Sequence, residues 1–129
     1  MESNFEAHVQ ERAVLVGLNA DCFTQAQTAT DETLEELEAL LETAGGFCTG
    51  KMLQNRHTPD AHSFIGEGKA QEVKMLVEAT ASTMVVFDNE LSPGHIRALE
   101  EIMGVPVLDI KGSVIIGFDQ HGINRLLGL

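Results

Sequence analysis

The chain of 129 residues has few basic side chains and no long apolar run. Its 8 lysines and arginines stand against 20 acids, which gives a formal net charge of −12. Non-specific binding to nucleic acid or anionic lipid draws on a positive surface field, so this charge excludes such binding over the whole surface. No stretch approaches the roughly 20 apolar residues of a membrane span, and the acidic amino end is unlike a secretion signal. We therefore expect a cytoplasmic protein that binds no membrane.

Cysteine is equally scarce. Cys22 and Cys48 stand far apart and form no CxxC pair, so neither a disulfide framework nor a zinc site is indicated. We predict that both are reduced, packed thiols. Six acids between positions 31 and 42 could suggest a metal cluster, but their helical spacing spreads them around an exposed arc. A solvated helix face is the favoured interpretation, and we predict no bound metal.

The apolar pattern predicts one α/β domain. Continuous apolar runs that end in turn residues are typical of strands covered on both faces of a parallel sheet. We predict strands over 13–18, 47–56, 83–87 and 105–109, and a polar loop over 19–29. Apolar residues at helical spacing predict helices over 34–44, 70–77 and 93–103. This alternation favours a three-layer α/β fold, a mostly parallel sheet with helices on its faces.

The most distinctive segment runs from Ser63 to Lys69. We predict a short strand over 63–65 that turns into a helix through Gly66-Glu67-Gly68-Lys69. Glycine allows positive φ angles and the close approach of a ligand, and a helix N-terminus offers unpaired N–H groups to an anion. Two interpretations stay open. In the first, the glycines are present only because the backbone conformation requires them. In the second, the corner formed by Gly66-Glu67-Gly68-Lys69 contacts a ligand or RNA.

The charge around this corner favours a local contact with phosphate. Residues 46–71 carry Lys51, Arg56 and Lys69 against only Asp60 and Glu67. We therefore add Lys51 and Arg56 to the four corner residues as candidates for binding nucleotide or RNA. Reversing the charge of Lys51, Arg56 and Lys69 should then weaken binding to an RNA partner and flatten its salt dependence.

A second candidate site follows the strand predicted over 83–87. Asp88, Asn89 and Glu90 could coordinate a cation, because strand ends often carry function in α/β sheets. They could equally form the turn before a helix that starts at Ser92-Pro93. No arrangement of nucleophile and base can be justified from residue order alone, so we predict no catalytic residue.

Six segments of the chain combine into a larger pattern. They are Arg12-Ala13-Val14-Leu15-Val16-Gly17, Leu34-Glu35-Glu36-Leu37, Thr43-Ala44-Gly45, Phe64-Ile65-Gly66-Glu67-Gly68-Lys69, Phe87-Asp88-Asn89-Glu90-Leu91-Ser92-Pro93 and Val107-Leu108-Asp109. Together they resemble the N-terminal domain of the HflX family of ribosome-associated GTPases. The resemblance implies an HflX N-terminal-like domain over 12–110 and leaves a divergent tail over 111–129. The segment over 1–11 has no apolar period, and we predict that it is loose.

The resemblance also implies a function, since this domain of HflX proteins engages the ribosome and has been connected with ATP binding. A complete relative continues into a GTPase domain, but the chain contains no GxxxxGK[ST] phosphate loop. We expect a truncated relative that acts as a non-catalytic interaction module and binds ribosomal RNA of the large subunit or a related partner. The alternative is an ATP- or GTP-binding domain with weak or no hydrolysis and no other cofactor.

The tail adds an expectation about assembly. Val114, Ile115, Ile116 and Phe118 form an apolar stretch beyond the part that resembles the family. A small domain rarely leaves such a patch in water. We predict a homodimer in which the tail packs on the other subunit, with a tail that folds back on its own sheet as the alternative.

Overall fold

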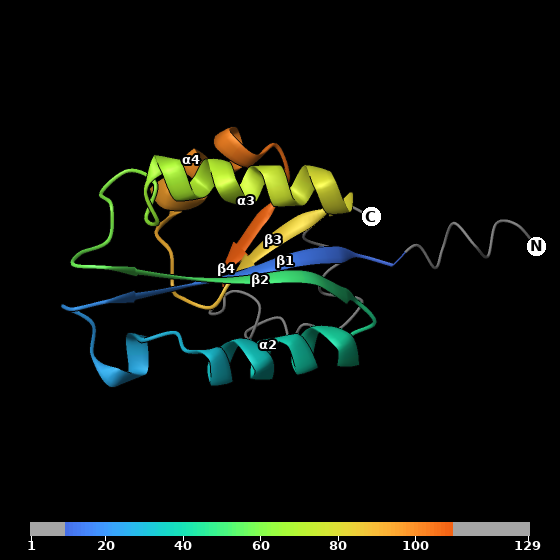
Figure 1. Ribbon diagram of the computed structural model, residues 1–129, viewed down its shortest axis with the longest axis horizontal. Helices are drawn as coiled ribbons and strands as arrows, with labels where there is room; N and C mark the ends of the chain where they lie inside the picture. The colour runs from blue at the N-terminus through green and yellow to red at the C-terminus, as the bar shows by residue number, and fades with distance from the viewer. Residues whose placement is uncertain (1–9, 110–129) are drawn as a thin grey trace, which may run out of the picture.

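Four parallel strands form a single sheet in the order β2-β1-β3-β4. The computed structural model describes residues 10–109. The strands are β1 (Arg12–Ala20), β2 (Phe47–Arg56), β3 (Met84–Phe87) and β4 (Val107–Asp109). Helix α2 (Asp31–Thr43) covers one face of the sheet, and α3 (Glu67–Thr80) and α4 (Pro93–Met103) cover the other (Figure 1). The predicted three-layer α/β fold is confirmed.

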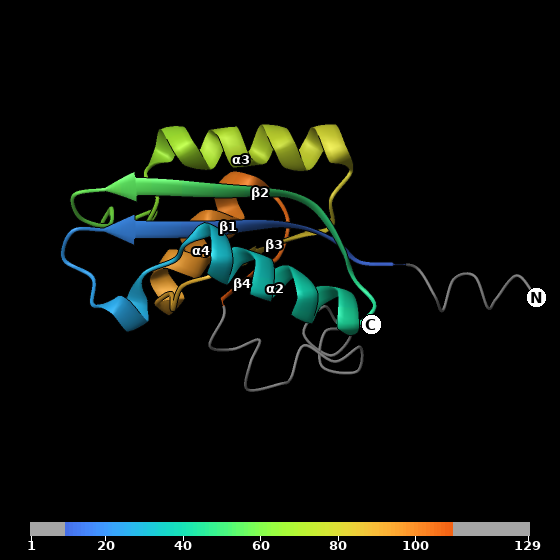
Figure 2. The ribbon, with the colours of Figure 1, turned by 60° about the horizontal axis from the view of Figure 1, so that its bottom comes forward.

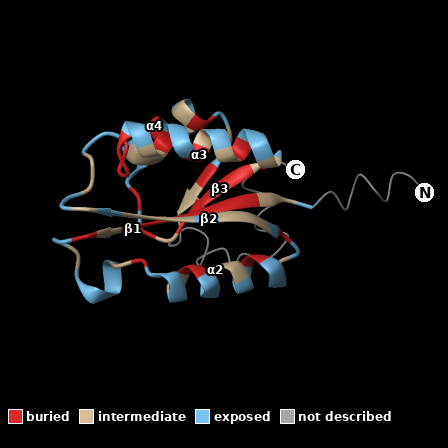
Figure 3. Cartoon of the chain, in the orientation of Figure 1, coloured by how far each residue is buried: buried red, intermediate tan, exposed pale blue. Residues whose placement is uncertain are grey.

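The central strand β1 shows why continuous apolar runs form this sheet. Its successive side chains point to opposite faces. Val14 and Val16 pack in the core beneath α3 and α4, whereas Ala13 and Leu15 pack in a second core beneath α2. All four side chains are fully buried. The strands β1 and β3 are therefore buried between two outer layers of helices whose outward sides are exposed, whereas β2 contains no buried residue (Figure 3).

The helix ends follow the signals in the sequence. Ser92 caps α4 by accepting a hydrogen bond from the His95 N–H at 3.1 Å, Pro93 occupies the first helical position, and Gly104 ends the helix at φ +77°. Thr30 caps α2 in the same way through the Thr33 N–H. The predicted boundaries of α4 are confirmed, because each of them depends on local backbone chemistry alone. Helix α2 begins at Asp31, before the predicted range of 34–44.

The predicted strand over 63–65 is wrong. Ser63, Phe64 and Ile65 are buried, but they form a turn that lies outside the sheet. Phe64 has a φ of +65°, which a strand does not allow, and the Ile65 N–H donates back to the Ser63 carbonyl at 2.6 Å. The apolar residues at this position therefore indicate that the segment is buried, but they do not indicate a strand.

Three smaller predictions also need correction. Strand β1 continues to Ala20, into the predicted loop, and a 3-10 helix, η1 (Gln25–Gln27), follows it. Leu40 has the helical spacing of a core residue but is 46% exposed, because it lies to one side of the buried stripe of α2. Cys22 is exposed rather than packed, since the chain has already left the sheet there.

Two further points concern the ends of the chain and membranes. The predicted boundaries near 11 and 110 fall at or beyond the edges of the described part, and the tail predicted to form a dimer lies wholly outside it. Among residues 10–109, no helix has the length and apolarity that a membrane crossing requires.

The sheet order places the glycine corner and Asp88 at the same end of the sheet. Because all strands are parallel, their carboxyl ends lie at the same end of the sheet. The chain adds β2 on one side of β1 and then β3 and β4 on the other side, so the strand order reverses at a point between β1 and β3. Ligands of doubly wound sheets commonly bind outside this reversal point. The glycine corner follows β2 at this end, and Asp88 follows β3.

Candidate functional site

The glycine corner is the turn at which the chain enters α3. Gly66 is the N-cap of the helix and has φ +90° and ψ 147°, angles that side chains with a Cβ rarely adopt. Gly68 lies in the first helical turn without a positive φ, and a Cβ there would meet no atom within 4 Å. The backbone therefore requires glycine at position 66 but not at position 68.

Arg56 lies directly against this corner. Its Nε donates to the Thr58 carbonyl at 2.9 Å, which folds the side chain back from the end of β2 toward the helix. A Cβ on Gly66 would lie 2.5 Å from one guanidinium nitrogen of Arg56. The structure thus brings together Arg56 and Gly66, two residues that the sequence placed ten positions apart.

The N-terminus of α3 has free donors beside this guanidinium. The first helical bond at this end runs from the Ala70 N–H to the Gly66 carbonyl at 2.9 Å. No side chain caps the helix, and within the described residues no group accepts from the N–H groups of Glu67, Gly68 or Lys69. Such a helix end attracts anions through its N–H groups and its dipole.

The charges at the corner are nearly balanced. Lys69 forms an ion pair with Glu72 at 3.0 Å, and its side chain is only 20% exposed. Glu67 adds a carboxylate to the first turn. An anion would therefore be held by backbone N–H groups and the Arg56 guanidinium, which suits a single phosphate contact better than broad coverage of RNA.

Lys51 does not join this corner. Its ammonium group contacts Glu38 of α2 at 2.6 Å, on the face of the sheet opposite α3. This ion pair raises the pKa of Lys51, chiefly through the hydrogen bond that the ammonium group donates to Glu38. The three cations that the sequence grouped together therefore lie on two faces of the sheet.

Asp60 organises the loop between β2 and the corner, a role that the sequence analysis missed. Its carboxylate accepts hydrogen bonds from the Ser63 N–H at 2.8 Å, the Ser63 hydroxyl at 3.0 Å and the His62 N–H at 3.0 Å. These bonds, above all the one from the Ser63 N–H, lower the pKa of Asp60. The Thr58-Pro59-Asp60 turn signal was present in the sequence, but the partners of Asp60 were not visible there.

Phe64 holds the same loop against the core. Its ring lies 5.3 Å from the His95 ring and 6.1 Å from the Phe87 ring, measured between centroids. His95 also contacts the Ala61 carbonyl through Nε2 at 3.1 Å. The positive φ of Phe64 is thus maintained by packing on α4 and β3, so the approach to the glycine corner is built rigidly.

Asp88 and Asn89 have different hydrogen-bond partners. The Asn89 side chain is 4% exposed and pairs with both backbone groups of Leu18, at 2.8 Å to the N–H and 3.0 Å to the carbonyl. Glu90 is exposed. No group of three or more His, Cys, Asp or Glu side chains in residues 10–109 is placed to hold a metal ion. Asn89 itself occupies the reversal point between β1 and β3.

Asp88 is half-buried beside α2. Burial raises the pKa of its carboxyl group above the ordinary value of 3.8; a hydrogen bond with Thr33 opposes this shift and the nearby Glu36 reinforces it. One carboxylate oxygen is buried with no partner among the described residues. A charged Asp88 therefore lowers the stability of the folded state.

We expect Asp88→Asn to stabilise the domain at neutral pH. Because the pKa is higher in the folded state, the charged carboxylate opposes folding above that pKa, and this penalty disappears once both states are protonated below 3.8. Urea unfolding at a series of pH values tests this, with Asp31→Asn at an exposed site as the control. If Asp88→Asn raises the free energy of unfolding equally below pH 3.8, the charge of Asp88 is not the cause of the gain in stability.

These features define a doubly wound parallel α/β domain in which a glycine turn and an uncapped helix N-terminus lie at the carboxyl ends of the strands. A family described as GTP-binding GTPase N-terminal matches residues 31–117. The chain is 37% identical over 111 residues to the GTPase HflX of Escherichia coli K12, an alignment that covers 86% of this chain and 25% of that protein. The chain belongs to this family, as an HflX N-terminal domain.

Further comparisons agree with this assignment. The GTPase HflX of Lacrimispora saccharolytica is 31% identical over 117 residues, which cover 91% of this chain and 27% of that protein. The chain thus spans about a quarter of the length of these relatives. A crystal structure of an SsGBP variant has a TM-score of 0.60 at 20% identity and covers 84% of this chain and 31% of its own, a likeness of fold.

Proposed function

We propose that this chain is a cytoplasmic, non-catalytic interaction domain that binds the large ribosomal subunit by holding an RNA phosphate at the glycine corner. The observation that carries the proposal is the Arg56 guanidinium packed beside the uncapped N-terminus of α3. Membership of the HflX family supports a ribosomal partner over other phosphate-bearing molecules. The sequence offers no phosphate loop for GTP hydrolysis.

The net charge supports a contact of this local kind. At −12 the chain repels RNA over most of its surface, so binding depends on a few well-placed donors. Backbone N–H groups at the start of a helix bind a phosphate without any basic side chain. Such a contact positions the phosphate but does not depend on the base sequence of the RNA. We infer that the corner fixes the orientation of the domain on the ribosome and leaves specificity to other contacts.

Reversing the charges on the α3 side should weaken ribosome binding. We expect Arg56→Glu combined with Lys69→Glu to reduce co-sedimentation with purified large subunits by about tenfold, since the Arg56 contact with the phosphate is lost and both new carboxylates repel it. Lys51→Glu, which reverses a cation on the opposite face, should leave co-sedimentation unchanged. Thermal unfolding of each variant checks that the fold is retained. Loss of binding with Lys51→Glu alone would move the contact to the α2 face.

A second candidate function uses the same donors, because the free N–H groups and Arg56 would donate hydrogen bonds to a nucleotide phosphate equally well. In that case ATP or GTP should bind saturably, and Arg56→Ala should weaken the binding. Asn89 fills the reversal point where such sheets usually hold a nucleotide, which favours the interaction domain. Titration of the chain with both nucleotides separates the two functions.

A further inference from the structure

Strand β2 forms one edge of the sheet, and its outer backbone groups are unpaired by any segment within residues 10–109 (Figure 2). Successive residues of a strand direct their N–H and C=O groups to opposite sides. The Arg56 carbonyl points toward β1, because it accepts from the Asp21 N–H at 3.3 Å. Counting back along β2, the backbone groups of Lys51, Leu53 and Asn55 therefore point outward.

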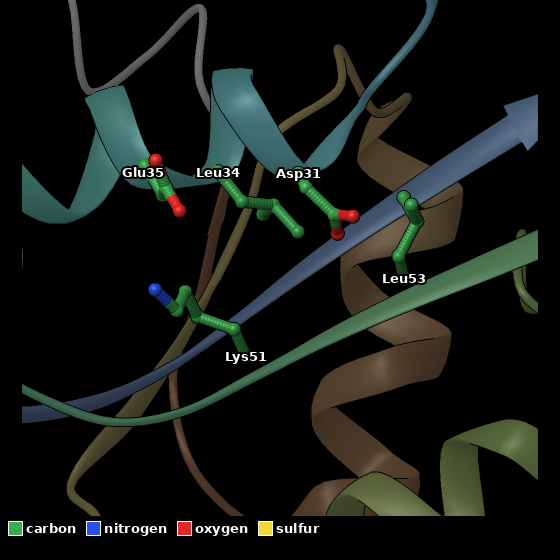
Figure 4. Close-up of a pocket in the computed structure, with 5 residues that line it drawn as sticks. All are labelled: Asp31, Leu34, Glu35, Lys51 and Leu53. Atoms are coloured by element: carbon green, nitrogen blue, oxygen red, sulfur yellow. The ribbon is translucent and has the colours of Figure 1, made fainter.

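A groove accompanies this edge on the α2 side. It has a volume of about 340 Å³ and is lined by Asp31, Leu34 and Glu35 of α2 and by Lys51 and Leu53 of β2. Figure 4 shows the side chains of the helix and of the strand extending toward one another across it. A strand added beside β2 would place every second side chain in this groove.

The groove is bordered by negative charge. Acidic residues recur on one side of α2 at spacings of three and four, so they form a stripe along the edge strand; they are Asp31, Glu35, Glu38 and Glu42. Lys51 neutralises Glu38. The remaining carboxylates select basic side chains on an incoming strand.

The other face of the edge is apolar around Met52. Met52 of β2 and Leu76 of α3 are partly buried hydrophobic residues packed against the main core. The Leu76 side chain also lies above Gly50, where a Cβ would approach it to 3.0 Å. An added strand would present its alternate side chains to this surface, where small apolar residues fit.

We propose that the outer edge of β2 binds an extended segment of a partner protein in which basic and apolar residues alternate. Main-chain hydrogen bonds to Lys51, Leu53 and Asn55 supply affinity, and the acidic stripe and the apolar face supply selectivity. A second copy of this chain is a poor occupant, because pairing two β2 edges would bring two acidic stripes together. This surface is independent of the glycine corner.

The probe for this surface is a blocked peptide of alternating valine and lysine, added to the full chain. We expect amide hydrogen exchange at Lys51, Leu53 and Asn55 to slow by at least about tenfold when the peptide binds. Exchange at Met52 and Gln54, whose N–H groups point toward β1, should not change. A peptide with glutamate in place of lysine should bind at least about tenfold more weakly.

Two sets of variants divide the proposed contributions. Asn55→Pro removes one outward N–H at an edge position that tolerates proline and should weaken peptide binding by about tenfold, whereas Asn55→Val keeps the N–H and should not. Asp31→Asn with Glu35→Gln should weaken peptide binding several-fold. The control, Glu32→Gln with Glu78→Gln, removes the same charge elsewhere and should leave peptide binding unchanged.

Several results would overturn the proposal. One is slow exchange of the Lys51, Leu53 and Asn55 amides in the free chain, which would mean that the chain covers its own edge. Others are equal binding of the lysine and glutamate peptides, unchanged binding to a folded Asn55→Pro variant, and no binding of the lysine peptide at millimolar concentration.

Discussion

Gly66→Ala is expected to destabilise the domain by about 3 kcal/mol, the upper end of the cost of such a backbone conformation for a residue with a Cβ. Two causes act together at this position. The φ of +90° is one that alanine rarely adopts, and the new Cβ would lie 2.5 Å from the Arg56 guanidinium. Arg56 would have to move away, and the proposed anion site would lose its cation.

Gly68 provides the matched control for this prediction. It lies in the first turn of α3, and a Cβ added there would have no atom within 4 Å, so alanine fits without strain. Alanine is also the better helix former, and we expect Gly68→Ala to stabilise the domain by about 0.5 kcal/mol. Chemical denaturation measures both. Equal effects at the two positions would contradict the assignment of backbone strain to Gly66 alone.

Asn89→Ala should cost about 3 kcal/mol, because it leaves buried backbone groups without partners. The Asn89 amide pairs with Leu18 as a further peptide unit of β3 would, and its Nδ2 also donates to the Gln27 carbonyl at 3.2 Å. This side chain therefore extends the pairing of β1 with β3 beyond Phe87 and attaches the loop around η1 to the sheet.

Denaturation of Asn89→Ala beside Asn55→Ala tests this role. Asn55 is exposed, so its truncation should change stability by less than about 0.5 kcal/mol. Asn89→Asp should also destabilise, since a carboxylate oxygen would face the Leu18 carbonyl where the amide now donates. A mild effect of Asn89→Ala would mean that water replaces the amide and that the reversal point is open to ligands.

The fold could be predicted largely because its signals are local. The apolar runs of β1 and β3 identified strands buried on both faces, and Ser92-Pro93 and Gly104 marked the ends of α4. The turn at Phe64 could not be predicted in this way. Its positive φ depends on Asp60 and on rings from α4 and β3, contacts that no local pattern encodes.

The candidate site was predicted less completely. Sequence proximity grouped Lys51 with Arg56, although an odd number of positions separates them along β2 and so places them on opposite faces. The alternation rule could have separated them beforehand. The pairing of Asn89 with Leu18 could not have been foreseen, because it depends on how far β1 extends past the end of β3.

The most direct test of the proposed function is the salt dependence of binding to purified large ribosomal subunits. For each phosphate contact that is lost, the slope of log affinity against log salt becomes shallower by about 0.7 to 0.9. We predict that Arg56→Glu with Lys69→Glu flattens the slope by about one such step relative to the original chain, and that Lys51→Glu does not. Identical slopes for the original chain and the double variant would contradict a phosphate contact at the glycine corner.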